Sequence, residues 1–183
     1  MLDETVRQKI AESYCSHILI ALEAGDHGAP FRDFLDNWYA HHVGEGHLTA
    51  AGRPIWFNNP CAAKHQSALS KMHFVSKNAA AILAQAKTSR LKFIGLRSQK
   101  DQTVRLMVDH AVPIRLMCQM MFKDAKIRSV GAIQTFLLHF YRLGVLTYEE
   151  DQRLNRLGLQ RKMPDNWDKN DIFARYHAAA ICC

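Results

Sequence analysis

Residues 108–114, Val-Asp-His-Ala-Val-Pro-Ile, place a carboxylate beside an imidazole at the end of a predicted strand. An imidazole exchanges protons near neutral pH, so this pair is suited to acid–base chemistry. In a regular strand over 103–111, His110 shares one face with the apolar residues, and Asp109 shares the opposite face with Arg105. A structural role fits the same pattern. His110 would then bond to backbone at the edge of the core, and Asp109 would pair with Arg105 or cap the following helix.

The same stretch resembles the first motif of HNH-type nucleases, in which an Asp-His pair ends the first strand of a ββα-metal unit. The resemblance implies that His110 is the general base that activates water and that Asp109 is a ligand of a divalent metal ion (Mg, Mn or Zn). The implied activity is that of a metal-dependent phosphodiesterase, in which the metal polarises a phosphate while the imidazole takes a proton. The resemblance covers seven of the 183 residues. The family continues with a glycine-rich loop and an asparagine, whereas here Pro113 leads directly into a predicted helix.

A second group of residues able to bind metal is the stretch 41–47, His-His-Val-Gly-Glu-Gly-His, where a predicted helix ends and a loop begins. Imidazoles and carboxylates bind zinc or another divalent ion, so His41, His42 and His47 are candidate metal ligands. Neighbouring helical residues point about 100° apart, so a compact site requires the loop to curl back. In the alternative interpretation, His41 and His42 interact favourably with the negative end of the helix dipole.

Basic residues are concentrated in one part of the chain. The formal net charge is +7, yet residues 85–128 hold ten Lys and Arg against three Asp and Glu, and the remainder is balanced at 14 of each. This asymmetry predicts an anionic partner, DNA or RNA, although a solvated basic face without a partner fits as well. The candidate nucleic-acid contacts are Lys87, Arg90, Lys92, Arg97, Lys100 and Arg105.

The elements that position these residues are mostly helices. Apolar residues recur at three- and four-residue steps, and prolines, glycines and a Thr147–Glu150 capping box mark the helix ends. Helices are predicted over residues 3–24, 30–44, 61–87 (with a break near 76–78), 147–158 and 170–181, and from Pro113 and Ser129 onward, the last ending at Gly144.

Residues 90–97 and 102–111 interrupt the helical pattern. They are short, rich in β-branched and aromatic residues, and joined by a polar turn, which predicts a β-hairpin. We therefore expect a mainly α (α+β) fold with one central β-hairpin at about 90–111. The length of 183 residues predicts a single domain, residues 1–183.

Several classes of protein are disfavoured by what the sequence lacks. No segment approaches the roughly 18–20 uninterrupted apolar residues of a membrane span, and the N-terminus has no signal-peptide pattern. Five cysteines without a Cys-x-x-Cys pair indicate reduced thiols rather than a disulfide framework. No phosphate-binding glycine loop, Gly-x-Ser-x-Gly elbow or His-Glu-x-x-His helix is present. We expect a cytoplasmic protein without a membrane partner.

These patterns lead to two hypotheses about function. The first is a nucleic-acid-binding protein that acts through the basic hairpin region, with metal-dependent nuclease activity as its catalytic form. The alternative is a non-enzymatic protein-binding module, an inhibitor or adaptor whose basic face docks on an acidic partner.

Overall fold

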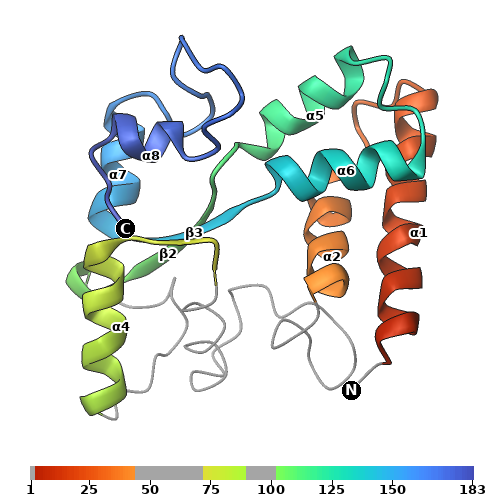
Figure 1. Cartoon of the computed structure of the whole chain (residues 1–183). Coiled ribbons are helices and arrows are strands. Elements are labelled where there is room, and N and C mark those ends of the chain that lie inside the picture. Colours follow the sequence, from red (N-terminus) through yellow and green to blue (C-terminus); the bar gives the residue numbers. More distant parts are fainter. Residues whose placement is uncertain (1–2, 44–71, 90–101) are drawn as a thin grey trace. The chain divides into compact units, whose positions relative to one another are not determined.

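The computed structural model describes residues 3–43, 72–89 and 102–183 (Figure 1). These residues form a mainly helical arrangement with a small three-stranded sheet, which confirms the predicted fold class. The contacts between residues divide the chain into two compact units, each made of two segments. Unit 1 comprises Met1–Ile55 and Ile114–Tyr141, and unit 2 comprises Trp56–Pro113 and Arg142–Cys183. The single-domain organisation stays a prediction.

The described part of unit 1 is helical. Its helices are α1 (Glu4–Glu23), α2 (Phe31–Val43), α5 (Ile114–Lys123) and α6 (Val130–Phe140). Helix α1 packs against α2 and α6, and its buried residues recur at three- and four-residue steps, as expected for one apolar stripe. Local chemistry sets the helix ends. Gly25 adopts a left-handed φ of +66° just beyond α1, and the Ser129 hydroxyl accepts the backbone N–H of Ala132 at the start of α6.

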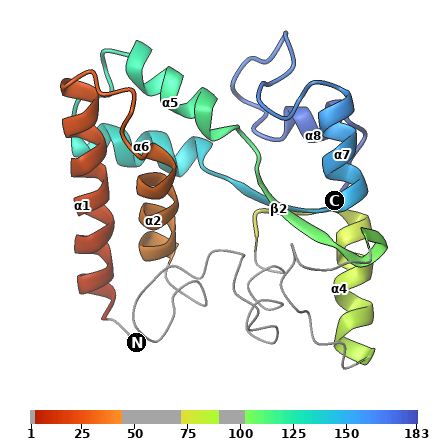
Figure 2. The same ribbon diagram turned by 180° about the vertical axis from the view of Figure 1, so that it is seen from behind.

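The described part of unit 2 is a sheet with helices on both sides (Figures 1 and 2). Its elements are β1 (Phe74–Val75), α4 (Lys77–Ser89), the 3-10 turn η1 (Gln102–Val104), β2 (Leu106–His110), β3 (Leu143–Thr147), α7 (Tyr148–Arg156) and α8 (Ala174–Ala178). Strand β3 lies in the middle, parallel to β1 and antiparallel to β2. All of β3 is buried, as a strand covered on both faces should be.

Glu150 joins the starts of two helices of unit 2. The predicted capping box is present, because Glu150 N–H donates to the Thr147 hydroxyl and the Glu150 carboxylate accepts the Thr147 N–H. The same buried carboxylate accepts the Ser76 hydroxyl at 2.6 Å and the Asn78 amide at 2.9 Å. One side chain therefore satisfies the first turn of α7 and fixes the start of α4.

Four of the expected elements differ from the structure. Within the helix expected over 61–87, residues 74 and 75 form strand β1, and the helix α4 begins only at Lys77. The helix expected over 170–181 is limited to α8, Ala174–Ala178. The helix that begins after Ser129 was expected to end at Gly144 but ends at Phe140, and Gly144 lies within strand β3. The second strand of the predicted hairpin begins at Leu106 rather than at 102, because 102–104 form a 3-10 turn, and its partner among the described residues is β3. Its predicted first strand, 90–97, lies outside the described residues.

None of the helices in the described ranges combines the length and the apolar character that crossing a membrane requires.

Candidate functional site

Asp109 and His110 are the last two residues of β2. In the antiparallel ladder Asp109 lies opposite Gly144 and His110 opposite Leu143. Leu106 is fully buried, while both Asp109 and His110 are partly buried. The expected contrast between an apolar and a solvated face is therefore weak, because residues from α8 cover the side chain of Asp109.

The partner of Asp109 is Arg175 of α8, 66 residues further along the chain. The Arg175 side chain is 1% exposed and pairs with the Asp109 carboxylate, which is 22% exposed. The Tyr176 hydroxyl donates to the same carboxylate oxygen, Oδ2, at 3.0 Å. Pairing with Arg105, one of the structural roles expected from the sequence, is wrong, because the side chain of Asp109 points to α8.

Arg175 also holds the backbone around the Asp-His pair. Its Nη2 donates to the His110 carbonyl, its Nε donates to the Ala111 carbonyl at 2.8 Å, and its Nη1 donates to the Leu159 carbonyl at 2.9 Å. Burial acts to lower the pKa of Arg175, but the Asp109 carboxylate and Tyr176 together outweigh it and raise that pKa overall. The guanidinium is therefore a permanent buried cation that fixes the end of β2.

Asp151 of α7 is a second carboxylate close to this group, and the sequence analysis did not single it out. Burial and the negative charge of Asp109 both raise the pKa of Asp151, and Arg175 partly offsets them. We refer to Asp109, Asp151, Arg175 and Tyr176 as the Arg175 cluster. Chemically, it is a buried ion pair beside a carboxylate whose affinity for a proton is raised.

The proposed metal ligands belong to two separate candidate sites, Asp109 in the first and His41, His42 and His47 in the second. Asp109 is in unit 2, whereas His41 and His42 are in unit 1 and His47 lies outside the described residues. Across residues 3–43, 72–89 and 102–183, no three or more His, Cys, Asp or Glu side chains form a group that could hold a metal ion. Metal binding stays a prediction.

His41 and His42 face different partners at the end of α2. The His41 ring stacks on Tyr14 with centroids 6.0 Å apart, and the His42 ring stacks on Trp38 at 5.0 Å. Burial and the neighbouring charge of Arg7 lower the pKa of both imidazoles, so they are neutral at pH 7. The cation at this helix end is instead Arg7 of α1, which donates to the His41 carbonyl at 3.2 Å. The lowered pKa of both imidazoles argues against the dipole interpretation, which stays a prediction.

Among the six candidate nucleic-acid contacts, only the side chain of Arg105 is described. It is half-buried, and its guanidinium carbon lies 5.0 Å from the centre of the Tyr148 ring. Lys87 lies in α4, whereas Arg90, Lys92, Arg97 and Lys100 lie outside the described residues. All six belong to unit 2.

Comparisons with protein-family models, with curated proteins and with solved structures found no match for this chain. The function is therefore inferred from the charges and contacts described above.

Arg175 and Tyr176 have one signal in the sequence. They lie in the predicted last helix, where Ile172, Tyr176 and Ala179 recur at apolar spacing and an arginine adjoins the stripe. A cation beside a buried stripe needs a carboxylate partner, and Asp109 is one of only two acidic residues in 56–113.

Proposed function

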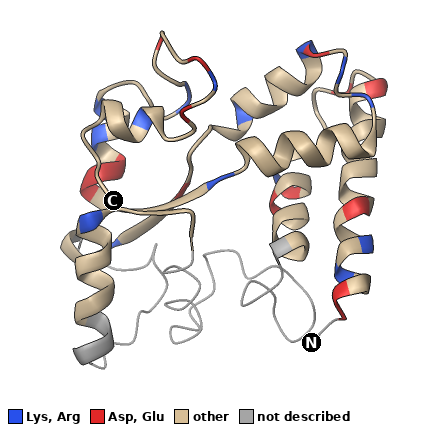
Figure 3. Cartoon of the chain, in the orientation of Figure 1, with Lys and Arg blue, Asp and Glu red and all other residues tan. Residues whose placement is uncertain are grey.

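We propose that this protein binds DNA or RNA through unit 2. The supporting observation is how charge divides between the units. Unit 2 contains 16 Lys and Arg against 8 Asp and Glu, whereas unit 1 contains 8 against 9. The entire positive excess of the chain thus falls within the residue ranges of unit 2, and Figure 3 marks the charged residues of the described part. A protein that neutralises phosphates is expected to concentrate its basic residues in this way.

Two carboxylates of unit 2 are kept away from a bound phosphate. Asp109 is neutralised by the buried guanidinium of Arg175, so the pair adds no net charge to the surface. Glu150 is 3% exposed and accepts hydrogen bonds from Ser76 and Asn78. The repulsion that these two carboxylates would exert on a polyanion is therefore reduced.

The proposed contact is the segment from Lys87 to Arg105. Residues 56–113 hold nine Lys and Arg against two Asp. The contacts that we propose are Lys87, Arg90, Lys92, Arg97, Lys100 and Arg105.

Cleavage of the bound nucleic acid would require His110 as base and Asp109 as metal ligand. The Asp109 carboxylate already accepts hydrogen bonds from Arg175 and Tyr176. A metal ion at that oxygen would compete with an internal cation, so the geometry favours binding without cleavage.

The test of binding is the dependence of affinity on salt. We expect the dissociation constant of the full chain for a labelled duplex, measured by fluorescence anisotropy, to rise steeply between 50 and 200 mM salt, by about 10³-fold if six phosphates are contacted. Changing Lys92, Arg97 and Lys100 together to Gln should reduce the slope of log K against log salt by about 2 to 3. The matched control removes three exposed charges from unit 1, Arg115, Lys123 and Lys126. An equal loss in both triple variants, or an unchanged slope in the first, contradicts the proposed contact.

A cleavage assay separates binding from catalysis. Supercoiled plasmid and structured RNA are incubated with the protein and Mg²⁺, Mn²⁺ or EDTA, beside a His110→Ala variant. We expect retardation in gels without cutting. Metal-dependent cutting that His110→Ala abolishes would instead establish the nuclease. A chain that binds neither nucleic acid but forms a stoichiometric complex with an acidic protein would support the adaptor alternative.

A further inference from the structure

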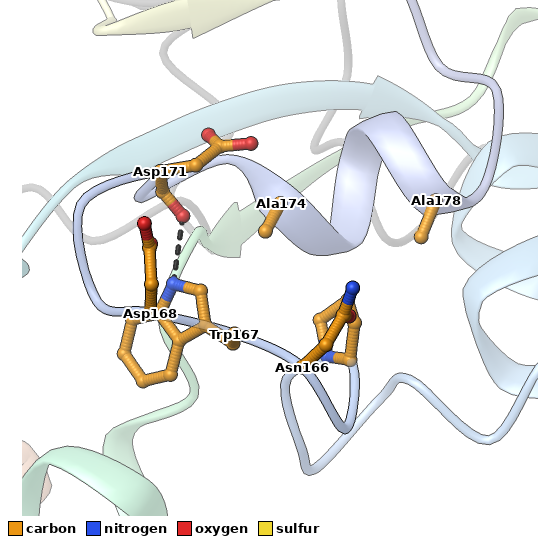
Figure 4. A pocket seen from close by; sticks show the side chains of 7 residues that line it. Asn166, Trp167, Asp168, Asp171, Ala174 and Ala178 are labelled. Carbon is orange, nitrogen blue, oxygen red and sulfur yellow. Dashed lines mark hydrogen bonds between the residues drawn. The ribbon is translucent and has the colours of Figure 1, made fainter.

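Unit 2 contains a small pocket whose lining residues belong neither to the Arg175 cluster nor to the proposed nucleic-acid contacts. It has a volume of about 240 Å³ and is formed by the loop before α8 and by α8 itself. The lining residues are Pro164, Asn166, Trp167, Asp168, Asp171, Ala174 and Ala178. Figure 4 shows Trp167 and Asp168 on one side and the small side chains of Ala174 and Ala178 on the other.

The indole of Trp167 is held in one orientation. Its Nε1–H donates to the Asp171 carbonyl at 2.8 Å, and its backbone N–H donates to the Pro164 carbonyl at 3.0 Å. The side chain is half-buried and lines the pocket. A fixed aromatic face stacks on a planar ring with little loss of side-chain entropy.

The two carboxylates of the pocket are fixed as hydrogen-bond acceptors. Asp168 accepts the backbone N–H of Asn170 at 2.8 Å and its side-chain amide at 3.1 Å. Asp171 accepts the backbone N–H of Phe173 at 3.0 Å and pairs with His177 at 2.8 Å. Each oxygen retains a second lone pair for an incoming N–H donor. The hydrogen bonds from Asn170 lower the pKa of Asp168, so this carboxylate stays ionised below its usual range.

The volume of the pocket and the charged residues in and near it indicate which class of ligand it can bind. Sites for drug-sized ligands measure roughly 300–1,000 Å³, so this pocket accommodates one ring system. A free cation is disfavoured, because Asp171 already pairs with His177 and because Arg161 and Lys162 precede the pocket in a unit with a positive excess. A neutral planar ring with N–H donors on its edge can stack on the indole of Trp167 and donate hydrogen bonds to the carboxylates. Nucleobases with an exocyclic amino group have such an edge.

We propose that this pocket takes one unpaired, amino-bearing nucleobase, stacked on Trp167 with its amino group donating to Asp168 or Asp171. The inference rests on the proposed function, since it makes single-stranded nucleic acid the preferred substrate of unit 2. A duplex cannot present a base in this way without unpairing it.

The first test uses free nucleotides and does not depend on binding of a polymer. Cytidine 5′-monophosphate has an exocyclic amino group, and thymidine 5′-monophosphate lacks one. We expect the cytidine nucleotide to shift the NMR signal of the Trp167 indole N–H, which is identified by its loss in Trp167→Phe, at concentrations several-fold below the thymidine nucleotide. Asp168→Asn should reduce that difference, and Ala178→Leu, which fills the pocket, should abolish the shift. A shift of the same size with arginine amide, or none with the cytidine nucleotide, overturns the proposal.

The second test uses polymers and separates the two proposals. In the full chain, Trp167→Ala should weaken binding of a single-stranded cytidine oligomer by about 5- to 100-fold, the effect of losing one stacked base, and Trp167→Phe should restore most of it. If both variants bind the oligomer as the unaltered chain does, the pocket proposal fails while salt-dependent binding by unit 2 stands. If no polymer binds but the cytidine nucleotide shifts Trp167, the proposed function fails and the pocket stands.

Discussion

At the scale of single residues, Arg175 organises unit 2. The planar guanidinium presents donors in several directions at once, which a lysine ammonium cannot match in geometry. Arg175 uses them on the Asp109 carboxylate and on carbonyls at the end of β2 and in the loop after α7. A buried charge is tolerated only when it is paired and fully hydrogen-bonded. The ion pair with Arg175 therefore accounts for a carboxylate at position 109 without any role in binding a ligand.

The first prediction concerns the loss of that cation. Arg175→Met should lower the free energy of unfolding by about 3 kcal/mol, because it leaves a partly buried carboxylate and several carbonyls without donors. Chemical denaturation followed by circular dichroism measures the change. The control is Arg153→Met, since Arg153 is only half-buried and donates to the Ala179 carbonyl at 3.2 Å; its cost should stay near 1 kcal/mol. An equal free energy of unfolding for Arg175→Met and the unaltered chain would show that the contacts of Arg175 do not stabilise the fold.

Asp151 gives a prediction about pH. Its pKa is raised in the folded chain, so folding favours the protonated carboxyl. The ionised form at neutral pH is destabilising, and stability is regained as the pH falls through the folded-state pKa. Asp151→Asn should thus raise the melting temperature at pH 7.5 by about 1–3 °C, and the gain should shrink toward pH 4. Glu149→Gln removes one exposed charge from the same helical turn and should show no such trend. A gain that is independent of pH would contradict the raised pKa.

At the scale of elements, most helices and strand β2 were predictable, whereas strands β1 and β3 were not. The helices at α1, α2, α5 and α7 begin and end within a few residues of the expected positions, because their caps and apolar spacing are local signals. Strand β3 has the sequence Leu-Gly-Val-Leu-Thr, a short apolar run that periodicity cannot tell from the tail of a helix. Pairing with β1 and β2 decides its conformation, and those partners lie at least 33 residues away.

Gly144 of β3 has a role that only the packed structure reveals. A Cβ at this position would lie 2.7 Å from the Tyr176 hydroxyl and 2.8 Å from a carbon of its ring. Tyr176 is fully buried and bonded to Asp109, so it has little room to move. Glycine is thus required here by a close approach of side chain to backbone.

The corresponding prediction compares two glycines. Gly144→Ala should destabilise the chain by about 1–3 kcal/mol through overpacking. Gly131→Ala, in α6, adds a methyl group with no heavy atom within 4 Å and should leave stability unchanged or raise it by about 0.5–1 kcal/mol. Thermal unfolding of the two variants side by side distinguishes them. Similar melting temperatures would show that Tyr176 shifts to make room for the added methyl group without a loss of stability.

At the scale of the whole molecule, the sequence predicted the excess of positive charge but not how that excess is divided between the two units. A window of residues 85–128 captured the excess, yet that window crosses from unit 2 into unit 1 at Ile114. Within unit 1, Arg128 is engaged by carbonyls near the end of α5, among them those of Met121 and Phe122. Its charge therefore caps a helix end, and counting along the sequence could not separate such a residue from basic residues of unit 2.

The way in which the chain alternates between the two units has a consequence for its synthesis. The chain leaves unit 1 after Ile55, returns at Ile114 and leaves again after Tyr141. Helix α6, against which α1 packs, begins at residue 130, more than 100 residues after α1 ends at residue 23. Domains usually fold as units in the order in which they are made. Unit 1 can therefore be completed only after residues 56–113 of unit 2 have been translated. During synthesis α1 can pack against α2, but the part of its surface that contacts α6 still lacks its partner.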